Sequence, residues 1–124
     1  MAISVVMQDG TEWYRVFIGA SSQRDSATAL LSRLKESNVL SGGSVISVPF
    51  ALRLERGLAL ADVGARVADY ATRGLHAYPL RQIDGTATMY TGAFESPSEA
   101  NTLADSLRVL GVPHVLAYRT GRGY

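Results

Sequence analysis

The sequence predicts an α+β fold, and three observations predict it. Short runs rich in Val, Ile and aromatic residues alternate along the chain with apolar residues at helical spacing. Asp-Gly pairs at 9–10 and 84–85 each lie between two strand-like runs, which is a strong short-range signal for a hairpin. The segment 14–34 returns, displaced by 73 positions, as the segment 87–107. The repeated unit is a strand followed at once by an amphipathic helix, and such a unit buries its apolar face only against further copies.

The N-terminal part of the chain predicts a hairpin and a helix. Strands are expected over 2–7 and 12–18, joined by the turn 8–11. A helix is expected over 22–37, because its apolar residues recur at i, i+3, i+4 and i+7. The residues of this expected buried stripe are Ala27, Leu30, Leu31 and Leu34.

The middle of the chain predicts a strand and a second helix. Residues 44–54 form a strand-like run, and Pro49 within it indicates an edge position or a bend, because proline cannot donate a backbone hydrogen bond. A helix over 59–73 is expected to end at Gly74, and Gly64 within it indicates a close approach to the sheet. Its expected buried stripe is Leu60, Val63, Val67, Tyr70 and Ala71.

The last part of the chain repeats the pattern. Strands are expected over 76–82 and 87–91, joined by the turn 83–86, and a closing strand over 112–119. Between them, Ser96 as N-cap and Pro97 at the first helical position begin a helix that ends at Gly111. Its inward residues are expected to be Ala100, Leu103, Leu107 and Leu110.

The element order is therefore β-β-α-β-α-β-β-α-β. Its last six elements, over 45–119, have the order β-α-β-β-α-β of ferredoxin-like (RNP-like) folds, in which right-handed crossovers place both helices on one face of an antiparallel sheet. The leading β-β-α is a partial repeat. We expect a partial unit over 1–43 that packs on the next unit or shares a strand with it, a complete unit over 44–120, and a flexible tail over 121–124.

Composition narrows the class of protein. The chain has 124 residues, the length of one domain, and its formal net charge of +1 gives no basic footprint for binding nucleic acid. It has no Cys, which excludes disulfides and thiolate metal sites. No apolar run approaches the roughly 20 residues of a membrane span, and the first residues do not form a secretion signal. We expect either a cytoplasmic protein or a piece of a longer exported chain.

The sequence contains no group of residues in the spacing typical of a catalytic or metal site. His76 and His114 each begin a strand and lack the spacing of metal ligands. Asp9 and Asp84 are explained by their Asp-Gly turns. No Ser lies in a nucleophile motif. We therefore expect no enzyme activity, no metal and no cofactor.

The two repeated strands resemble the SPOR (sporulation-related repeat) domains of bacterial cell-envelope proteins. The resemblance lies in YRVFIGA at 14–20, in MYTGAF at 89–94 with the Ala- and Leu-rich helix over 96–111, and in VPHVLAYR at 112–119. It covers nearly the whole chain as tandem or one-and-a-half copies.

The resemblance implies a non-catalytic module of β-α-β-β-α-β fold that binds peptidoglycan glycan strands denuded of stem peptides at the division septum. It implies a periplasmic or cell-envelope location as part of a longer exported or membrane-anchored protein, a monomer or weak dimer, and division or cell-wall proteins as further partners.

A sheet face is the candidate glycan-binding site. Alternation places Trp13, Arg15 and Phe17 on the face of their strand opposite the helices, and Thr88 and Tyr90 stand at the positions that match Arg15 and Phe17. Aromatic platforms with Arg and Thr donors suit sugars, whose rings have apolar faces and hydroxyl edges. Arg53 is the nearest equivalent of the Gln that is frequent in the first strand of SPOR domains.

Other interpretations of these residues stay open. Trp13 and Phe17 equally fit packing beneath the N-terminal strand, beneath the third helix or against a second subunit, and Arg15 fits a solvated surface position. For the whole chain, the alternative function is a protein-interaction or oligomerisation module that pairs through an open sheet edge. A small-molecule-sensing ferredoxin-like domain is a third, without a pocket signature in the sequence.

Overall fold

The computed structural model describes residues 2–8, 11–17, 24–38 and 46–122, and it describes side chains over 25–38 and 46–122. The elements follow in the predicted order, with a 3₁₀ turn before each of the last two helices. They are β1 (Ala2–Gln8), β2 (Thr11–Phe17), α1 (Arg24–Glu36), β3 (Phe50–Leu58), a 3₁₀ helix (Leu60–Asp62), α2 (Val63–Thr72), β4 (Ala77–Arg81), β5 (Ala87–Phe94), a 3₁₀ helix (Pro97–Ala100), α3 (Asn101–Leu110) and β6 (Val115–Tyr118).

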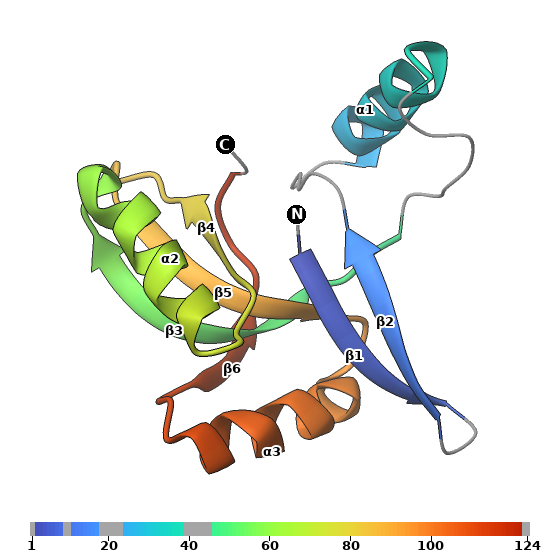
Figure 1. Cartoon of the computed structure of the whole chain (residues 1–124). Coiled ribbons are helices and arrows are strands. Elements are labelled where there is room, and N and C mark those ends of the chain that lie inside the picture. The colour runs from blue at the N-terminus through green and yellow to red at the C-terminus, as the bar shows by residue number, and fades with distance from the viewer. Residues whose placement is uncertain (1, 9–10, 18–23, 39–45, 123–124) are drawn as a thin grey trace.

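The strands form two sheets (Figure 1). β1 and β2 make a two-stranded antiparallel sheet, and β4-β5-β3-β6 make a four-stranded sheet in which all the pairings are antiparallel. The strand order and the crossovers through α2 and α3 are compatible with the ferredoxin-like arrangement. Both helices lie on one face of the four-stranded sheet, and β1 runs beside β5 and α3. The fold is therefore mixed α+β, as expected.

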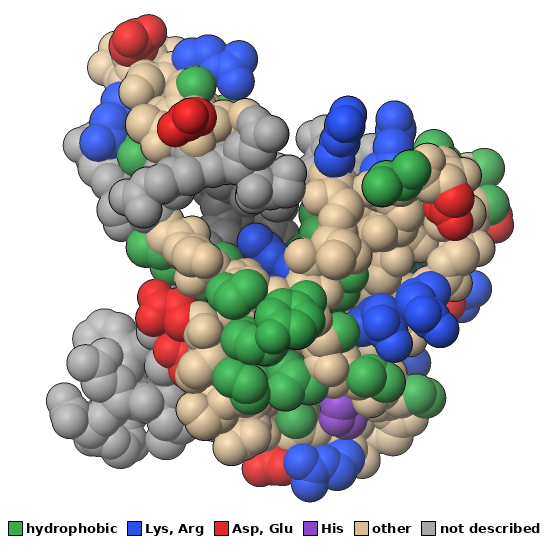
Figure 2. All heavy atoms as spheres, turned by 180° about the vertical axis from the view of Figure 1, so that it is seen from behind, with side chains coloured by type: hydrophobic (Ala, Val, Ile, Leu, Met, Phe, Trp, Pro, Cys, Tyr) green, Lys and Arg blue, Asp and Glu red, His purple; other side chains and the backbone are tan. Residues whose placement is uncertain are grey.

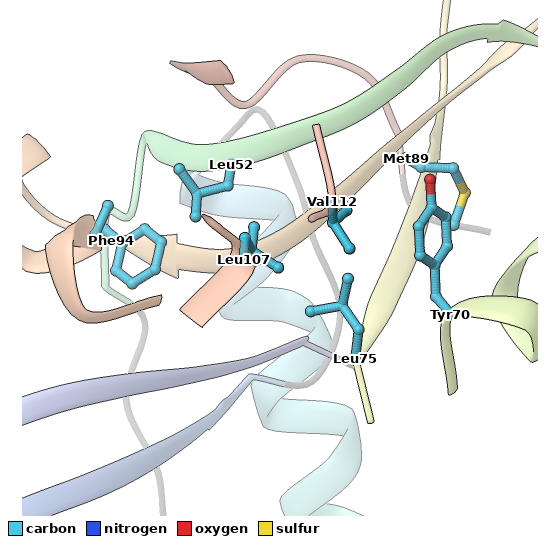
Figure 3. Close-up of a cluster of buried hydrophobic side chains, with 8 residues drawn as sticks. Leu52, Tyr70, Leu75, Met89, Phe94, Leu107 and Val112 are labelled. Carbon is cyan, nitrogen blue, oxygen red and sulfur yellow. The ribbon is translucent and has the colours of Figure 1, made fainter. Parts of the chain in front are cut away.

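The core lies between the four-stranded sheet and its two helices. Figure 3 shows side chains from β3, β5, α2 and α3 directed toward one another in this layer. Phe94 and Leu107 are fully buried, because the Ala- and Leu-rich face of α3 packs on the sheet. The buried members of the cluster are Leu52, Tyr70, Leu75, Met89, Phe94, Ala100, Leu107 and Val112.

A glycine in β5 keeps both halves of that strand directed at the core. Gly92 has a φ of 72°, and one more residue lies on β5 than on β3 between their paired positions, as in a β-bulge. Because the bulge shifts the alternation by one residue, Met89 and Phe94 both enter the same core. A Cβ on Gly92 would lie 2.5 Å from the Phe94 ring, so the position excludes other residues.

The strand predicted over 44–54 differs from the one observed. β3 begins at Phe50, directly after Pro49, and residues 46–49 are irregular. Proline has no backbone N–H to donate to a neighbouring strand, so pairing starts beyond it. β3 then continues to Leu58 with Gly57 at a φ of 68°.

Some expected core positions of the helices are exposed. Leu60 lies in the 3₁₀ turn that precedes α2, and its side chain and that of Leu110 remain 39% and 47% exposed. Ala71 is exposed as well. Gly64 has nothing within 4 Å of the place where a Cβ would stand, so the expected close approach to the sheet is wrong. The apolar stripe of α1, consisting of Ala27, Leu30, Leu31 and Leu34, is half-buried, because α1 lies apart from the four-stranded sheet (Figure 1).

The two Asp-Gly turns both join antiparallel strands. Gln8 pairs with Thr11 at the first hairpin, whose central residues 9 and 10 lie outside the described residues. In the second, Gln82 N donates to Thr86 O, and Gly85 alone in the turn has a positive φ. The loop has three residues, 83–85, and is therefore not a two-residue type I′ turn. A three-residue loop needs only one residue with a positive φ, whereas a type I′ turn needs two.

Candidate binding site

The face of the four-stranded sheet that lies opposite α2 and α3 carries a cavity of about 550 Å³. β3 contributes Arg53 and Arg56 to its lining, and β5 contributes Thr88 and Tyr90. β6 contributes Ala117 and Tyr118. The turn between β4 and β5 and the residues after β6 complete the wall, and their contributions include Gln82, Asp84, Thr86 and Thr120. The volume lies within the range of about 300–1,000 Å³ that is usual for ligand pockets.

Three of the predicted site residues come together in this cavity. Arg53 and Tyr90 are paired across β3 and β5, and Thr88 lies two residues along β5 on the same face. Thr88 is 4% exposed and Tyr90 is 2% exposed, whereas Arg53 is half-buried. The ring of Tyr90 is therefore covered, in contrast to the open aromatic platform that the sequence suggested.

The chain itself covers Tyr90. The residues after β6, Arg119–Arg122, form what we call the C-terminal strap. The backbone of Arg122 exchanges two hydrogen bonds with that of Arg81 at the end of β4, at 2.8 and 2.9 Å. Beneath the strap a second hydrophobic cluster fills the sheet face, consisting of Ala51, Tyr78, Leu80 and Tyr90. The sequence predicted a flexible tail from residue 121, whereas Gly121 and Arg122 lie against β4.

A polar network joins the strap to the cavity. The hydroxyl of Tyr90 lies 3.2 Å from Oγ1 of Thr120 and accepts a hydrogen bond from the backbone N–H of Thr120 at 3.3 Å. Gln82 holds the same residue from the other side: its Nε2 donates to Thr120 O at 2.9 Å, and its Oε1 accepts from Thr120 Oγ1 at 3.2 Å. The hydroxyl of the buried Tyr90 is thus paired with the half-buried Gln82 and the exposed Thr120 in one network along the wall of the cavity.

Tyr78 lies between the sheet and the strap and contacts both. Its ring stacks on that of Tyr90 with centroids 6.2 Å apart, and its hydroxyl donates to Gly92 O at 2.5 Å. The guanidinium of Arg119 lies 6.0 Å above the Tyr78 ring, within the reach of a cation–π contact. Burial raises the pKa of Tyr78 above its ordinary value, and the positive charge of Arg119 opposes that rise.

The cavity carries two guanidinium groups without a carboxylate partner. Among the described residues, no Asp or Glu forms an ion pair with Arg53 or Arg56. The carboxylate of Asp84 also lines the cavity, but it holds the turn by accepting from Thr86 Oγ1 at 2.6 Å and from Thr86 N at 2.9 Å. The hydrogen bond from the Thr86 side chain is the main cause that lowers the pKa of Asp84 below its ordinary value. The two Arg side chains thus remain available to an anionic ligand.

The other three predicted site residues, Trp13, Arg15 and Phe17, lie on β2, where the structure describes the backbone but not the side chains. Their register against β1 is regular, with Arg15 opposite Ser4 and Phe17 opposite Ala2. Their role in a site therefore stays a prediction.

The described residues hold no group of three or more side chains suited to a metal ion. His76 is exposed, and Nδ1 of the half-buried His114 lies 2.9 Å from its own neighbour Val112 O. In the part of the chain that the structure describes, no helix has the length and apolar character that crossing a membrane requires.

The residues that the sequence did not single out are Gln82, Arg56 and the strap. Arg56 lies on the long strand β3, and its place in the lining of the cavity depends on the register shifts of that strand. Gly121 carries a local signal, because glycine has no Cβ and so permits a positive φ, here 113°.

Comparison with known proteins gives one match. The family model of the SPOR domain matches residues 1–47, which covers 47 of the 124 residues and spans β1, β2 and α1. No curated protein and no solved structure matches the chain. The match supports a SPOR domain in this part of the chain. SPOR domains are peptidoglycan-binding modules that occur in cell-envelope and division proteins.

Proposed function

We propose that this chain is a non-catalytic module that binds the glycan strands of peptidoglycan, and that it prefers strands denuded of stem peptides at the division septum. The observation that carries the proposal is the cavity on the sheet face opposite α2 and α3, where Arg53, Thr88 and Tyr90 lie together. The family match to residues 1–47 supports the peptidoglycan class of ligand.

The chemistry of the cavity suits a sugar acid. The hydroxyl oxygens of Thr86, Thr88 and Thr120 can accept hydrogen bonds from sugar hydroxyls and acetamido N–H groups. Removal of a stem peptide by an amidase leaves a carboxylate on the lactyl group of each muramic acid. The two unpaired guanidinium groups of Arg53 and Arg56 match such a carboxylate, whereas an amide-linked peptide offers no charge at that atom.

The repeat extends the proposal to the first copy. A displacement of 73 positions relates Trp13, Arg15 and Phe17 to Thr86, Thr88 and Tyr90. We infer that the first copy presents an equivalent glycan-contacting strand, and that the chain divides near residue 44 into a partial and a complete SPOR-like unit.

Sacculus binding tests the proposal. The purified chain is mixed with intact sacculi and with sacculi that an amidase has stripped, and the bound fraction is measured by co-sedimentation. We expect stronger binding to stripped sacculi, and weaker binding after Arg53→Gln or Arg56→Gln. Arg73→Gln is the matched control, because Arg73 is exposed at the end of α2 on the other side of the sheet. Failure of the unmodified chain to co-sediment with stripped sacculi would refute the proposal.

A second candidate function, self-association or protein binding through a sheet edge, rests on β6. This strand is at an edge of the four-stranded sheet, and Val115, Leu116 and Tyr118 are 53%, 42% and 68% exposed. Figure 2 shows hydrophobic side chains gathered on the face seen from behind. Edge strands with apolar side chains are sites of strand addition. Sedimentation velocity over a hundredfold range of concentration distinguishes the two functions, because only the second requires the mass to rise.

A further inference from the structure

The C-terminal strap runs across the sheet face that carries the cavity. β6 and β4 are the two edges of the four-stranded sheet, and the strap leads from one to the other. It leaves β6 where Arg119 N donates to Pro49 O at 2.6 Å, and it ends at β4 in the two backbone hydrogen bonds between Arg81 and Arg122. Figure 1 shows the last residues running up behind β5 to the end of β4.

Gly121 allows the strap to pack closely against β4 and Gln82. Gly121 has a φ of 113°, and a Cβ there would lie 2.6 Å from Gln82 Nε2 and 2.7 Å from Arg81 O. Both the backbone conformation and the space exclude a side chain. Since Gln82 also binds Thr120 through two hydrogen bonds, the strap has one tightly defined position over the sheet.

This position decides what the cavity offers to a ligand. Thr120 belongs to the cavity wall, while the strap and Tyr78 bury the ring of Tyr90. A buried ring cannot stack on a sugar. The hydroxyl of Tyr90, in contrast, directs Oγ1 and the backbone N–H of Thr120.

We propose, on the basis of the proposed function, that the strap forms one wall of the glycan site. In this wall Thr120 Oγ1 and Gln82 Oε1 accept hydrogen bonds from the polar edge of a sugar unit, and Tyr90 acts as a positioning residue for Thr120. The site therefore recognises hydroxyl and acetamido groups by hydrogen bonds at the strap, and the aromatic ring that it leaves open to a sugar is that of the exposed Tyr118 and not that of Tyr90.

The test uses three variants of the full chain. Thr120→Val keeps the shape of the side chain and removes its hydroxyl, Tyr90→Phe removes the positioning hydroxyl, and Gly121→Val displaces the strap. The control is Thr72→Val, since Thr72 is exposed on α2 and its hydroxyl bonds only to Asp69 O in its own helix. Affinity is measured by calorimetry with soluble glycan fragments prepared from amidase-treated sacculi.

We expect Kd to rise about three- to tenfold for Thr120→Val, as for the loss of one hydrogen bond, and to a similar or smaller extent for Tyr90→Phe. Gly121→Val should raise Kd more than either. Hydrogen exchange of the Arg81 amide, which donates to Arg122 O, reports independently whether the strap has left β4.

The outcomes separate the two proposals. If the unmodified chain binds no glycan, the proposed function fails, whatever the exchange data show. If the unmodified chain binds and Gly121→Val exchanges rapidly at Arg81 yet binds as tightly or more tightly, the strap is not part of the site and the inference is overturned. Unchanged Kd for Thr120→Val overturns it too. If Gly121→Val does not fold, Thr120→Val and Tyr90→Phe decide the question alone.

Discussion

The hydrogen bond between Tyr70 and Glu55 gives a prediction about alkaline stability. The hydroxyl of Tyr70 donates to Glu55 Oε2 at 2.8 Å, and Arg66 Nε lies 3.3 Å from the same oxygen. Desolvation by burial is the main cause that raises the pKa of Tyr70 to about 12, and the hydrogen bond to Glu55 and its negative charge raise it further. Tyr70 therefore holds its proton in the folded chain at a pH where the unfolded chain has lost it.

The sign and size of the effect follow from linkage. A group whose pKa is raised on folding contributes stability that is complete below its unfolded pKa, 10.0 here, and that is lost as the pH rises toward the folded value of about 12. Two pKa units correspond to about 2.7 kcal/mol at most, and about half of that is lost by pH 11. At neutral pH, Tyr70→Phe should cost about 1.5 kcal/mol, the lower end for hydrogen bonds to charged groups, because the Glu55 side chain is 28% exposed and keeps Arg66.

Urea unfolding of the unmodified chain and of Tyr70→Phe, monitored by circular dichroism between pH 7 and pH 11.5, tests this reasoning. The difference in the free energy of unfolding between the two proteins should be constant up to about pH 9 and should then fall, because the variant has no hydroxyl to ionise at this position. Taking the difference removes the contributions of the other tyrosines, including Tyr78. A difference that stays constant to pH 11.5 would show that the environment of Tyr70 does not retain its proton.

Three further substitutions test the packing of the fold by thermal or urea unfolding. Gly92→Ala should destabilise the chain strongly, because its Cβ would lie 2.5 Å from the Phe94 ring at a φ of 72°, and a Tm equal to that of the unmodified chain would contradict the bulge. Gly64→Ala should instead stabilise the chain by about 0.5–1 kcal/mol, since the position is inside α2 with open space around it. A loss of stability would mean that another part of the chain packs against Gly64. Leu107→Ala should cost about 2–5 kcal/mol, and a cost below 1 kcal/mol would mean that α3 does not seal the core.

Local signals in the sequence predicted the elements well. The Asp-Gly pairs identified both hairpins, and Pro97 and Gly111 marked the helix of the second copy, because these residues act through their own backbone geometry. The alternation along β5 placed Tyr90 on the face away from the helices, and the structure has Met89 in the core and Tyr90 in the cluster on the other face. Helix stripes were less reliable: Leu60 and Leu110 have helical spacing, but they lie at the helix ends, beyond the edge of the sheet.

The candidate site could be predicted only in part. Thr88 and Tyr90 could be predicted from strand alternation, because the pattern tells which face of a strand a side chain occupies. Arg53 was predicted from the resemblance to SPOR domains. The burial of Tyr90 was not accessible, since it depends on a chain segment 30 residues away that crosses the sheet. The periodic pattern of a strand does not indicate that a distant segment of the chain crosses it. Gly121 carried the only trace of it, and a positive φ at a glycine does not say what the chain passes over.

The strap also affects the two edges of the four-stranded sheet differently. β4 has Pro79 within it, which has no N–H to offer, and its last residue is already bonded to Arg122, so a new strand finds few groups to pair with. β6 contains no proline, and among the described residues it has no such pair of hydrogen bonds to the strap. A sheet that accepts a partner at one edge alone can pair with a second copy about a two-fold axis, and it cannot add a third. Association through the edge strands of the four-stranded sheet should therefore stop at a closed dimer instead of continuing into filaments.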